Sequence, residues 1–178
     1  MRGLLEEYQI LAASGPVGRA VVTQVWGSAP RPEGACLIAT LDGRMAGSVS
    51  GGCVESAAAE EIRAVMTDGM AKKISWGVTH ERAWEMGLSC GGTIEVFVEP
   101  AVRPELIQAA RSMGSTVVAT VIGGAAPLAT GVCAEEGGGS HVLGALPEAL
   151  APPIRAAATA ALTRLTSRVE TIETASGP

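Results

Sequence analysis

The sequence predicts an α/β protein in which mixed sheets are flanked by helices. Short β-branched runs bounded by Gly and Pro alternate with alanine-rich stretches of helical period. The same order, strand, hairpin, helix and strand, recurs in the second half of the chain, which indicates an internal duplication. With 178 residues, 47% hydrophobic and 17% charged, the chain is long enough for a well-buried core. We therefore expect a single domain over 1–178, with a first copy in 1–100 and a degenerate second copy in 101–178.

The first copy is predicted from local sequence signals. Residues 1–10 have the pattern of an amphipathic helix, and Gly15-Pro16 ends it. Residues 19–26 are β-branched and apolar, as in a buried strand, and the Gly and Pro content of 27–34 indicates a loop. Asp42-Gly43 is typical of a hairpin turn, which joins the next strand to a short strand after it. The second strand is expected over 35–41, and the short strand after the turn ends at Ala46. A helix is expected over 53–68. Two further strands are expected over 72–76 and 93–98, with 78–89 connecting them.

The second copy serves as an internal control for the first. Residues 21–29 align with 117–125, and Cys36 aligns with Cys133, so we interpret both cysteines as core residues. Pro104 fits the first turn of a helix to about 113, and a helix over 146–165 and a strand over 167–172 are expected to follow. This copy lacks Pro30-Arg31 and carries unrelated residues in place of the glycine-rich run before Cys53. Residues unique to the first copy are therefore the better functional candidates.

Composition excludes several classes of protein. The formal charge of −5, without any cluster of Lys and Arg, argues against binding nucleic acid. No apolar stretch approaches the roughly 20 residues of a membrane span, and the N-terminus has no signal-peptide core, so we expect a cytoplasmic protein without stable membrane insertion. Thiols stay reduced there, and no Cys-x-x-Cys pair exists. His80 and His141 lie far apart, so the sequence predicts no metal site.

The run from Gly47 to Glu55 is the most informative segment. Ser50-Gly51-Gly52-Cys53 precedes a predicted helix, where unpaired backbone amides and the helix dipole favour an anion. The same environment lowers the pKa of a thiol. A tight strand-to-helix turn without a ligand explains the loop equally well. The spacing matches neither Gly-x-Gly-x-x-Gly nor a phosphate-binding P-loop.

A second glycine–cysteine segment, Ser89-Cys90-Gly91-Gly92, lies further along the chain. Cys53 and Cys90 each adjoin a glycine pair and are absent from the second copy, which makes them candidate reactive thiols. The alternative is that each only packs in the interior, as most reduced cysteines do.

Four further residues of the first copy are candidate ligand contacts. Glu55 is either a helix-terminal carboxylate stabilised by the dipole or an acceptor for paired N–H donors such as a pterin edge. Arg31, between two prolines, is either solvated or a rigid phosphate contact. The hydroxyls of Ser28 and Ser48 either contact a ligand or complete turns.

Three segments together, Gly27-Ser-Ala-Pro-Arg31, Gly47-Ser-Val-Ser-Gly-Gly-Cys-Val-Glu55 and Gly87-Leu-Ser-Cys-Gly-Gly92, closely resemble the XdhC/CoxI family. Its members are accessory proteins for maturation of molybdenum hydroxylases such as xanthine dehydrogenase and carbon monoxide dehydrogenase. The resemblance implies that the chain binds molybdenum cofactor (molybdopterin) and carries it without using it for turnover. It also implies that the cofactor is protected during sulfuration by a cysteine desulfurase and then delivered to the apo-enzyme.

The resemblance also implies a set of site residues and partners. Cys53 and Cys90 become candidates for sulfur or molybdenum contact, and the cofactor-binding candidates are Ser28, Arg31, Ser48, Ser50, Gly51, Gly52, Glu55, Ser89, Gly91 and Gly92. The expected partners are a molybdenum hydroxylase client, a cysteine desulfurase and a second copy of the chain in a homodimer. Two other functions stay open: a thiol protein that relays sulfur or electrons through Cys53 and Cys90, and a partner-binding protein with a vestigial pocket.

The chain departs from the family pattern at two points. Many members carry a further Rossmann-like C-terminal domain, which this sequence does not contain. Where the family often has a basic residue followed by methionine, this chain has Cys36-Leu37.

Overall fold

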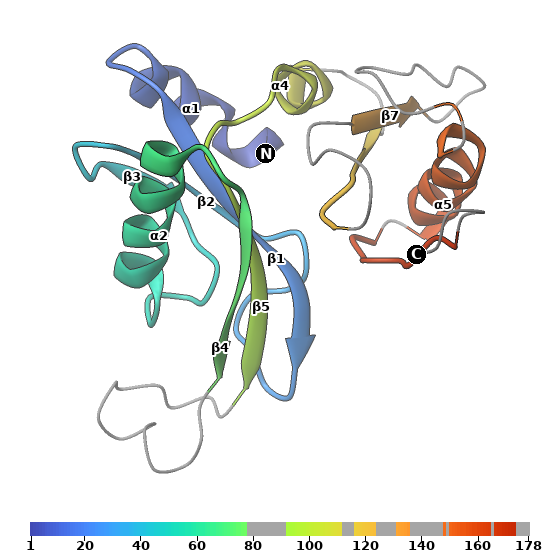
Figure 1. Ribbon diagram of the computed structural model, residues 1–178, viewed down its shortest axis with the longest axis horizontal. Coiled ribbons are helices and arrows are strands. Elements are labelled where there is room, and N and C mark those ends of the chain that lie inside the picture. Colours follow the sequence, from blue (N-terminus) through green and yellow to red (C-terminus); the bar gives the residue numbers. More distant parts are fainter. Residues whose placement is uncertain are drawn as a thin grey trace. The chain divides into compact units, whose positions relative to one another are not determined.

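The computed structural model describes residues 1–77, 92–111, 116–123, 131–135, 148, 150–164 and 166–173. The chain divides into two compact units (Figure 1). One spans Gly3–Val102, and the other spans Arg103–Pro178 together with Met1–Arg2. The single domain expected over 1–178 stays a prediction.

The first unit is built on a five-stranded sheet of order β3-β2-β1-β5-β4. Its strands are β1 (Val17–Trp26), β2 (Cys36–Thr40), β3 (Met45–Gly47), β4 (Lys72–Gly77) and β5 (Thr93–Glu99). The α/β class is therefore confirmed. The expected mixed sheet is corrected, because every neighbouring pair of these strands is antiparallel. Short connections from β1 to β2 and from β2 to β3 permit only antiparallel neighbours, since a parallel pair needs a crossover of a dozen or more residues.

Two helices pack on this sheet, and a short 3-10 turn, η1 (Arg2–Leu4), precedes them. Helix α1 (Leu5–Ala12) contacts β1, β2 and β3, whereas α2 (Glu55–Asp68) lies across β1, β2 and β5 (Figure 1). Because α2 joins β3 at one edge of the sheet to β4 at the other, it spans the width of the sheet. Its buried residues, Ala58, Ala59, Ile62 and Val65, recur at helical spacing and form one face. The helix starts two residues later than predicted, at Glu55.

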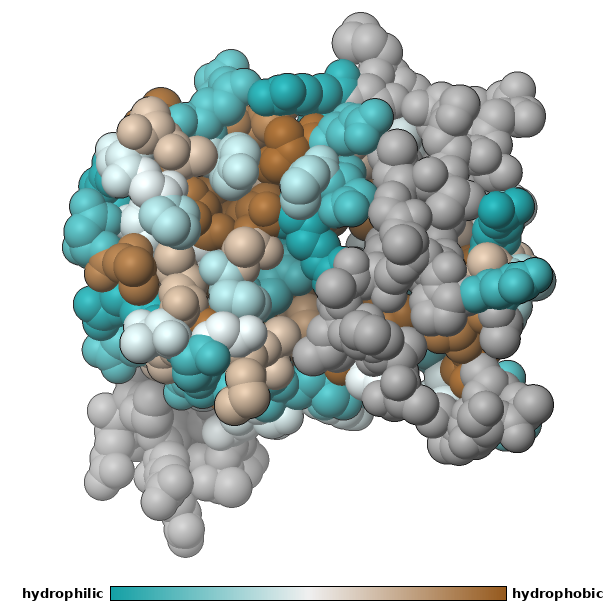
Figure 2. All heavy atoms as spheres, turned by 45° about the horizontal axis from the view of Figure 1, so that its top comes forward, coloured by the Kyte–Doolittle hydropathy of each residue, from teal (hydrophilic) through white to brown (hydrophobic). Residues whose placement is uncertain are grey.

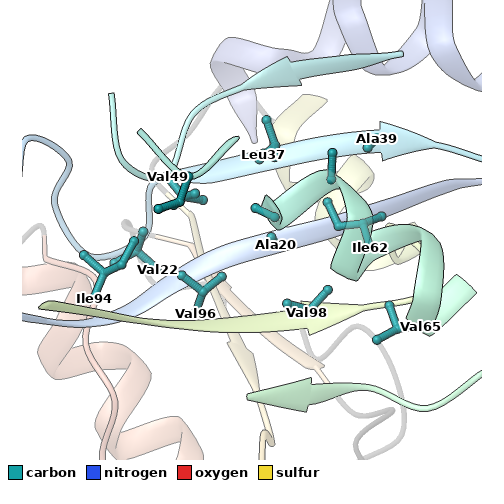
Figure 3. Close-up of a cluster of buried hydrophobic side chains, with 13 residues drawn as sticks. Ala20, Val22, Leu37, Ala39, Val49, Ile62, Val65, Ile94, Val96 and Val98 are labelled. Carbon is teal, nitrogen blue, oxygen red and sulfur yellow. The ribbon is translucent and has the colours of Figure 1, made fainter. Parts of the chain in front are cut away.

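The core lies between α2 and the sheet (Figure 3). It is built from small aliphatic side chains, as the scarcity of aromatics requires: Ile62 and Val65 of α2 meet Leu37, Val96 and Val98 of the strands. Packing is close here. A Cβ built on Gly18 would lie 2.5 Å from Cγ2 of Ile62, so this glycine is needed for the helix to approach β1.

Several polar residues of the strands are also buried, and the structure gives them partners. Arg19 of β1 lies directly opposite Glu99 of β5, and Nε of Arg19 is 2.6 Å from Oε1 of Glu99. Both side chains are almost completely buried. A buried charge without a partner is costly, so this pair favours the observed register of β1 and β5.

The second unit contains α4 (Pro104–Arg111), an antiparallel hairpin of β6 (Thr116–Thr120) and β7 (Gly131–Glu135), and α5 (Ala151–Arg164). Two prolines in the first turn of α5 fit its start at Ala151. The strand expected over 167–172 is wrong, because these residues are described without strand pairing. The hairpin and helix follow the expected order, but without that closing strand the duplication stays a prediction.

Within the described residues, no helix combines the length and apolarity that crossing a membrane requires. Apolar side chains do reach the surface: Figure 2 shows hydrophobic patches among hydrophilic residues on the Gly3–Val102 unit. Exposed large hydrophobic residues of this unit are Ile10, Trp26, Leu41, Met45 and Met70.

Candidate functional site

The loop between β3 and α2 is organised around the carboxylate of Glu55. Its Oε1 accepts hydrogen bonds from Oγ of Ser48 (2.7 Å) and from the amides of Val49 (3.1 Å) and Ser50 (2.9 Å). Its Oε2 accepts hydrogen bonds from Oγ of Ser50 (2.6 Å) and from the amide of Gly52 (2.8 Å). A carboxylate has about four lone-pair positions, so these donors occupy its capacity.

Hydroxyl groups bind the remaining amides of this loop. Oγ of Ser50 accepts the amides of Cys53 (3.0 Å) and Val54 (2.9 Å), and Oγ of Ser48 accepts the amide of Gly51 (2.9 Å). Every backbone amide from Val49 to Val54 therefore donates to a side chain of the same segment. The amides ahead of the helix were expected to be unpaired, but the carboxylate of Glu55 and the hydroxyls of Ser48 and Ser50 accept them.

The same contacts fix the ionisation of Glu55. Burial raises the pKa of this carboxyl, but hydrogen bonds from the hydroxyls of Ser50 and Ser48 and from the amide of Ser50 outweigh burial. The pKa falls from 4.5 to about 2, so Glu55 is ionised at neutral pH. Its acceptor positions are in use, and the geometry therefore favours Glu55 as a residue that positions the loop over one that receives N–H groups of a pterin.

The loop between β1 and β2 contacts this segment through Pro30. A Cβ built on Gly51 would lie 3.2 Å from Cβ of Pro30, and Gly51 has a φ of +85°, which L side chains rarely adopt. Glycine therefore fits at position 51 for two reasons: a side chain would crowd Pro30, and glycine adopts a positive φ without strain. Next to Pro30, the side chain of Arg31 is exposed, as is that of Ser28.

Gly92 brings the third predicted segment to the same place. A Cβ built on Gly92 would lie 2.4 Å from the carbonyl oxygen of Ser28 and 3.1 Å from the amide nitrogen of Ala29. The backbone before β5 therefore lies directly against the backbone after β1. The first segment thus lies in contact with both others, through Pro30 on Gly51 and through Ser28 on Gly92.

The thiol of Cys53 lies beside this assembly. Cys53 is half-buried and packs against the apolar core, and it is not part of a disulfide. Ser89, Cys90 and Gly91 lie outside the described residues, as do His80 and His141. Among the residues that the structure describes, no group of three or more His, Cys, Asp or Glu is arranged to hold a metal ion.

The sequence pattern pointed to the segment around Glu55 but did not predict the hydrogen bonds within it. One signal was present: Gly52 and Glu55 are three residues apart, the spacing at which a first-turn carboxylate reaches back to an amide ahead of a helix. The contacts of Gly51 and Gly92 had no local signal, because each depends on a segment distant in the sequence.

Part of this chain is similar to known proteins. The model of the XdhC and CoxI family matches residues 10–77, which contain the first two signature segments. Residues 10–77 are thus similar to the XdhC and CoxI family. The match ends before β5, so Gly92 lies beyond it.

Two curated relatives each match less than half of the chain. The molybdenum cofactor insertion chaperone PaoD of Escherichia coli is 42% identical over 80 residues, which are 43% of this chain and 24% of that protein. A probable xanthine dehydrogenase subunit of Bacillus subtilis is 37% identical over 82 residues, covering 45% of this chain and 25% of that protein. The matched stretch thus covers about a quarter of each relative.

A solved structure shares the fold more widely. A protein described as a xanthine dehydrogenase from Bacillus halodurans superposes with a TM-score of 0.65 at 23% identity, covering 86% of this chain and 47% of that one. This likeness shows that the fold is one already seen in an experimental structure.

Proposed function

We propose that this chain binds molybdenum cofactor as cargo and takes part in the maturation of a molybdenum hydroxylase. The observation that carries the proposal is the meeting of three signature segments in one place, with Gly51 on Pro30 and Gly92 on Ser28. The names of the two relatives, one a cofactor insertion chaperone and the other a probable part of a xanthine dehydrogenase, support the same role.

The chemistry of the exposed groups fits such a cargo. Molybdopterin carries a phosphate, a polar pterin edge and a dithiolene. Arg31 and Ser28 are exposed beside the loop and suit the phosphate, since a guanidinium binds an anion by charge and paired N–H donors. The thiol of Cys53 is the candidate for contact with sulfur or molybdenum. Ser48, Ser50, Gly52 and Glu55 shape the loop that presents these groups.

The finer steps of the proposal rest on the family resemblance. The chain holds the cofactor without turning it over, and a cysteine desulfurase adds sulfur to the cofactor while it is held. A xanthine dehydrogenase or carbon monoxide dehydrogenase type enzyme receives it in the cytoplasm. Ser89, Cys90 and Gly91 complete the site, and a second copy of the chain forms a homodimer with the first.

Anaerobic purification from a molybdenum-replete host tests the proposal. Molybdenum is measured by mass spectrometry and pterin by fluorescence of its oxidised derivative, both per mole of chain. We expect near-stoichiometric cofactor, and release of cofactor to an apo-hydroxylase with recovery of its activity. Purified chain that holds neither pterin nor molybdenum under any loading condition would contradict the proposal. Loading without transfer would restrict the role to storage.

A further inference from the structure

A β-bulge interrupts β1 three residues before its end. The pairing of β1 with β5 runs from Arg19–Glu99 to Val22–Val96, and resumes one residue out of step at Gln24–Glu95. Thr23 is the inserted residue. From there the pairing continues to Trp26–Thr93, and the next residues of the two strands are Gly27 and Gly92.

The bulge changes which side chains face the core. Val22 is buried in the core and Val25 packs against it, although they are three positions apart, a spacing that an unbroken strand would place on opposite faces. Trp26, which a regular strand would direct to the same face as Val22, is instead 45% exposed. The same one-residue shift sets where Gly92 meets the backbone of Ser28.

Thr23 is held in this bulge by Glu95. The threonine is buried, and its Oγ1 lies 3.1 Å from the carbonyl oxygen of Glu95 and 2.9 Å from Oε1 of the same residue. Oε2 of Glu95 is 3.6 Å from Nζ of Lys73 on the neighbouring strand β4. A polar chain of Thr23, Glu95 and Lys73 thus crosses three strands at the bulge.

We infer that Thr23 and Glu95 are positioning residues, which fix the bulge and through it the contact of Gly92 with Ser28 beside Arg31. β-Bulges next to functional sites commonly re-aim side chains in this way. The inference deepens the proposed function and rests on it, because it states how the cofactor-binding end of the sheet is kept in position.

The test compares four full-length variants. Thr23→Val removes the hydroxyl, Thr23→Ser keeps it, and Glu95→Gln weakens the acceptor. Thr40→Val is the matched control: Thr40 is also a buried strand threonine, and its hydroxyl contacts Asp42 and the carbonyl of Arg44 at the opposite end of β1. Hydrogen exchange of the backbone amides in 27–34 and 48–54 is measured together with retained pterin.

For Thr23→Val we expect exchange in 27–34 to rise about tenfold, the factor for losing one buried hydrogen bond, and retained pterin to fall several-fold. Glu95→Gln should change both in the same direction. Thr23→Ser should stay near wild type, and Thr40→Val should change exchange only near 40–44. If Thr23→Val does not fold, the exchange in 27–34 and the retained pterin of Glu95→Gln test the inference instead.

Unchanged exchange in 27–34, or a rise in exchange with full pterin retention, would overturn the inference. Wild-type chain without any pterin would instead refute the proposed function. The exchange data would then still decide whether Thr23 positions the loop.

Discussion

The hydroxyl of Ser50 donates a hydrogen bond of 2.6 Å to Oε2 of Glu55, and the amide of Ser50 donates one of 2.9 Å to Oε1. A loop that the sequence suggested as an anion site thus contains its own anion. Glu55 accepts hydrogen bonds from donors that would otherwise be open to a ligand, while Oγ of Ser48, itself bonded to Glu55, accepts the amide of Gly51.

Replacing Glu55 by Gln should destabilise the first unit. The amide keeps the size of the side chain, but its NH₂ group would face N–H and O–H donors in place of an acceptor. We expect a loss of about 1.5–3 kcal/mol in the free energy of unfolding, the range for hydrogen bonds to a charged group. Urea unfolding measures it. Glu60→Gln, on the exposed face of the same helix, is the control and should change stability by less than about 0.5 kcal/mol. If the two substitutions lower the free energy of unfolding equally, the hydrogen bonds of Glu55 do not stabilise the loop.

Stability should also depend on pH through Glu55. Its pKa is lowered in the folded state, from 4.5 to about 2, so the folded chain binds fewer protons than the unfolded chain in this window. The stabilisation is therefore fully present above about pH 4.5 and is lost as pH falls toward 2. The stability difference between wild type and Glu55→Gln should shrink over that range. A difference that is constant with pH would show that ionisation of Glu55 does not contribute.

Gly92→Ala should disturb the contact between the first and third segments. The new Cβ would meet the carbonyl oxygen of Ser28 at 2.4 Å, and no side-chain rotation relieves this contact, because the backbone fixes the position of the Cβ and the oxygen is a backbone atom. Overpacking of this kind costs about 1–3 kcal/mol, and we expect thermal unfolding to shift accordingly and retained pterin to fall. Gly3→Ala is the matched control, since no atom lies within 4 Å of the Cβ built there. A Gly92→Ala chain as stable and as well loaded as Gly3→Ala would contradict the packing described.

Arg31→Gln should weaken cofactor retention without affecting folding. Arg31 is exposed, so its removal leaves no buried group unpaired. If it contacts the phosphate, losing a charge-assisted pair should weaken binding about tenfold. Equilibrium dialysis with molybdopterin measures the change, with Arg63→Gln on the exposed face of α2 as the charge-matched control. If the two variants bind molybdopterin with equal affinity, Arg31 does not contact its phosphate.

Cys53→Ala tests whether the thiol of Cys53 contacts the cofactor. If the thiol contacts the cofactor, retained molybdenum should fall relative to wild type while urea unfolding changes little, because the residue is only partly buried. Molybdenum per chain and activation of an apo-hydroxylase are both measured. Full retention together with full activation would reject any role for this thiol.

Much of the secondary structure could be predicted from local signals. The predicted strands match β1, β2, β4 and β5, and the run Ala57–Ala59 lies in the predicted helix that matches α2. The expected strand over 167–172 failed for a physical reason: strand propensity forms a strand only where a neighbour accepts its backbone hydrogen bonds.

By itself the sequence determined the α/β class and showed which segments resemble the XdhC and CoxI family, because these depend on local composition, spacing and motif. Only the tertiary structure decided how they meet. The antiparallel order of the sheet, the bulge at Thr23 and the contact of Gly92 with Ser28 arise between segments far apart in the chain. The five hydrogen bonds that Glu55 accepts also required the folded loop, since a spacing of residues does not specify the direction of each amide.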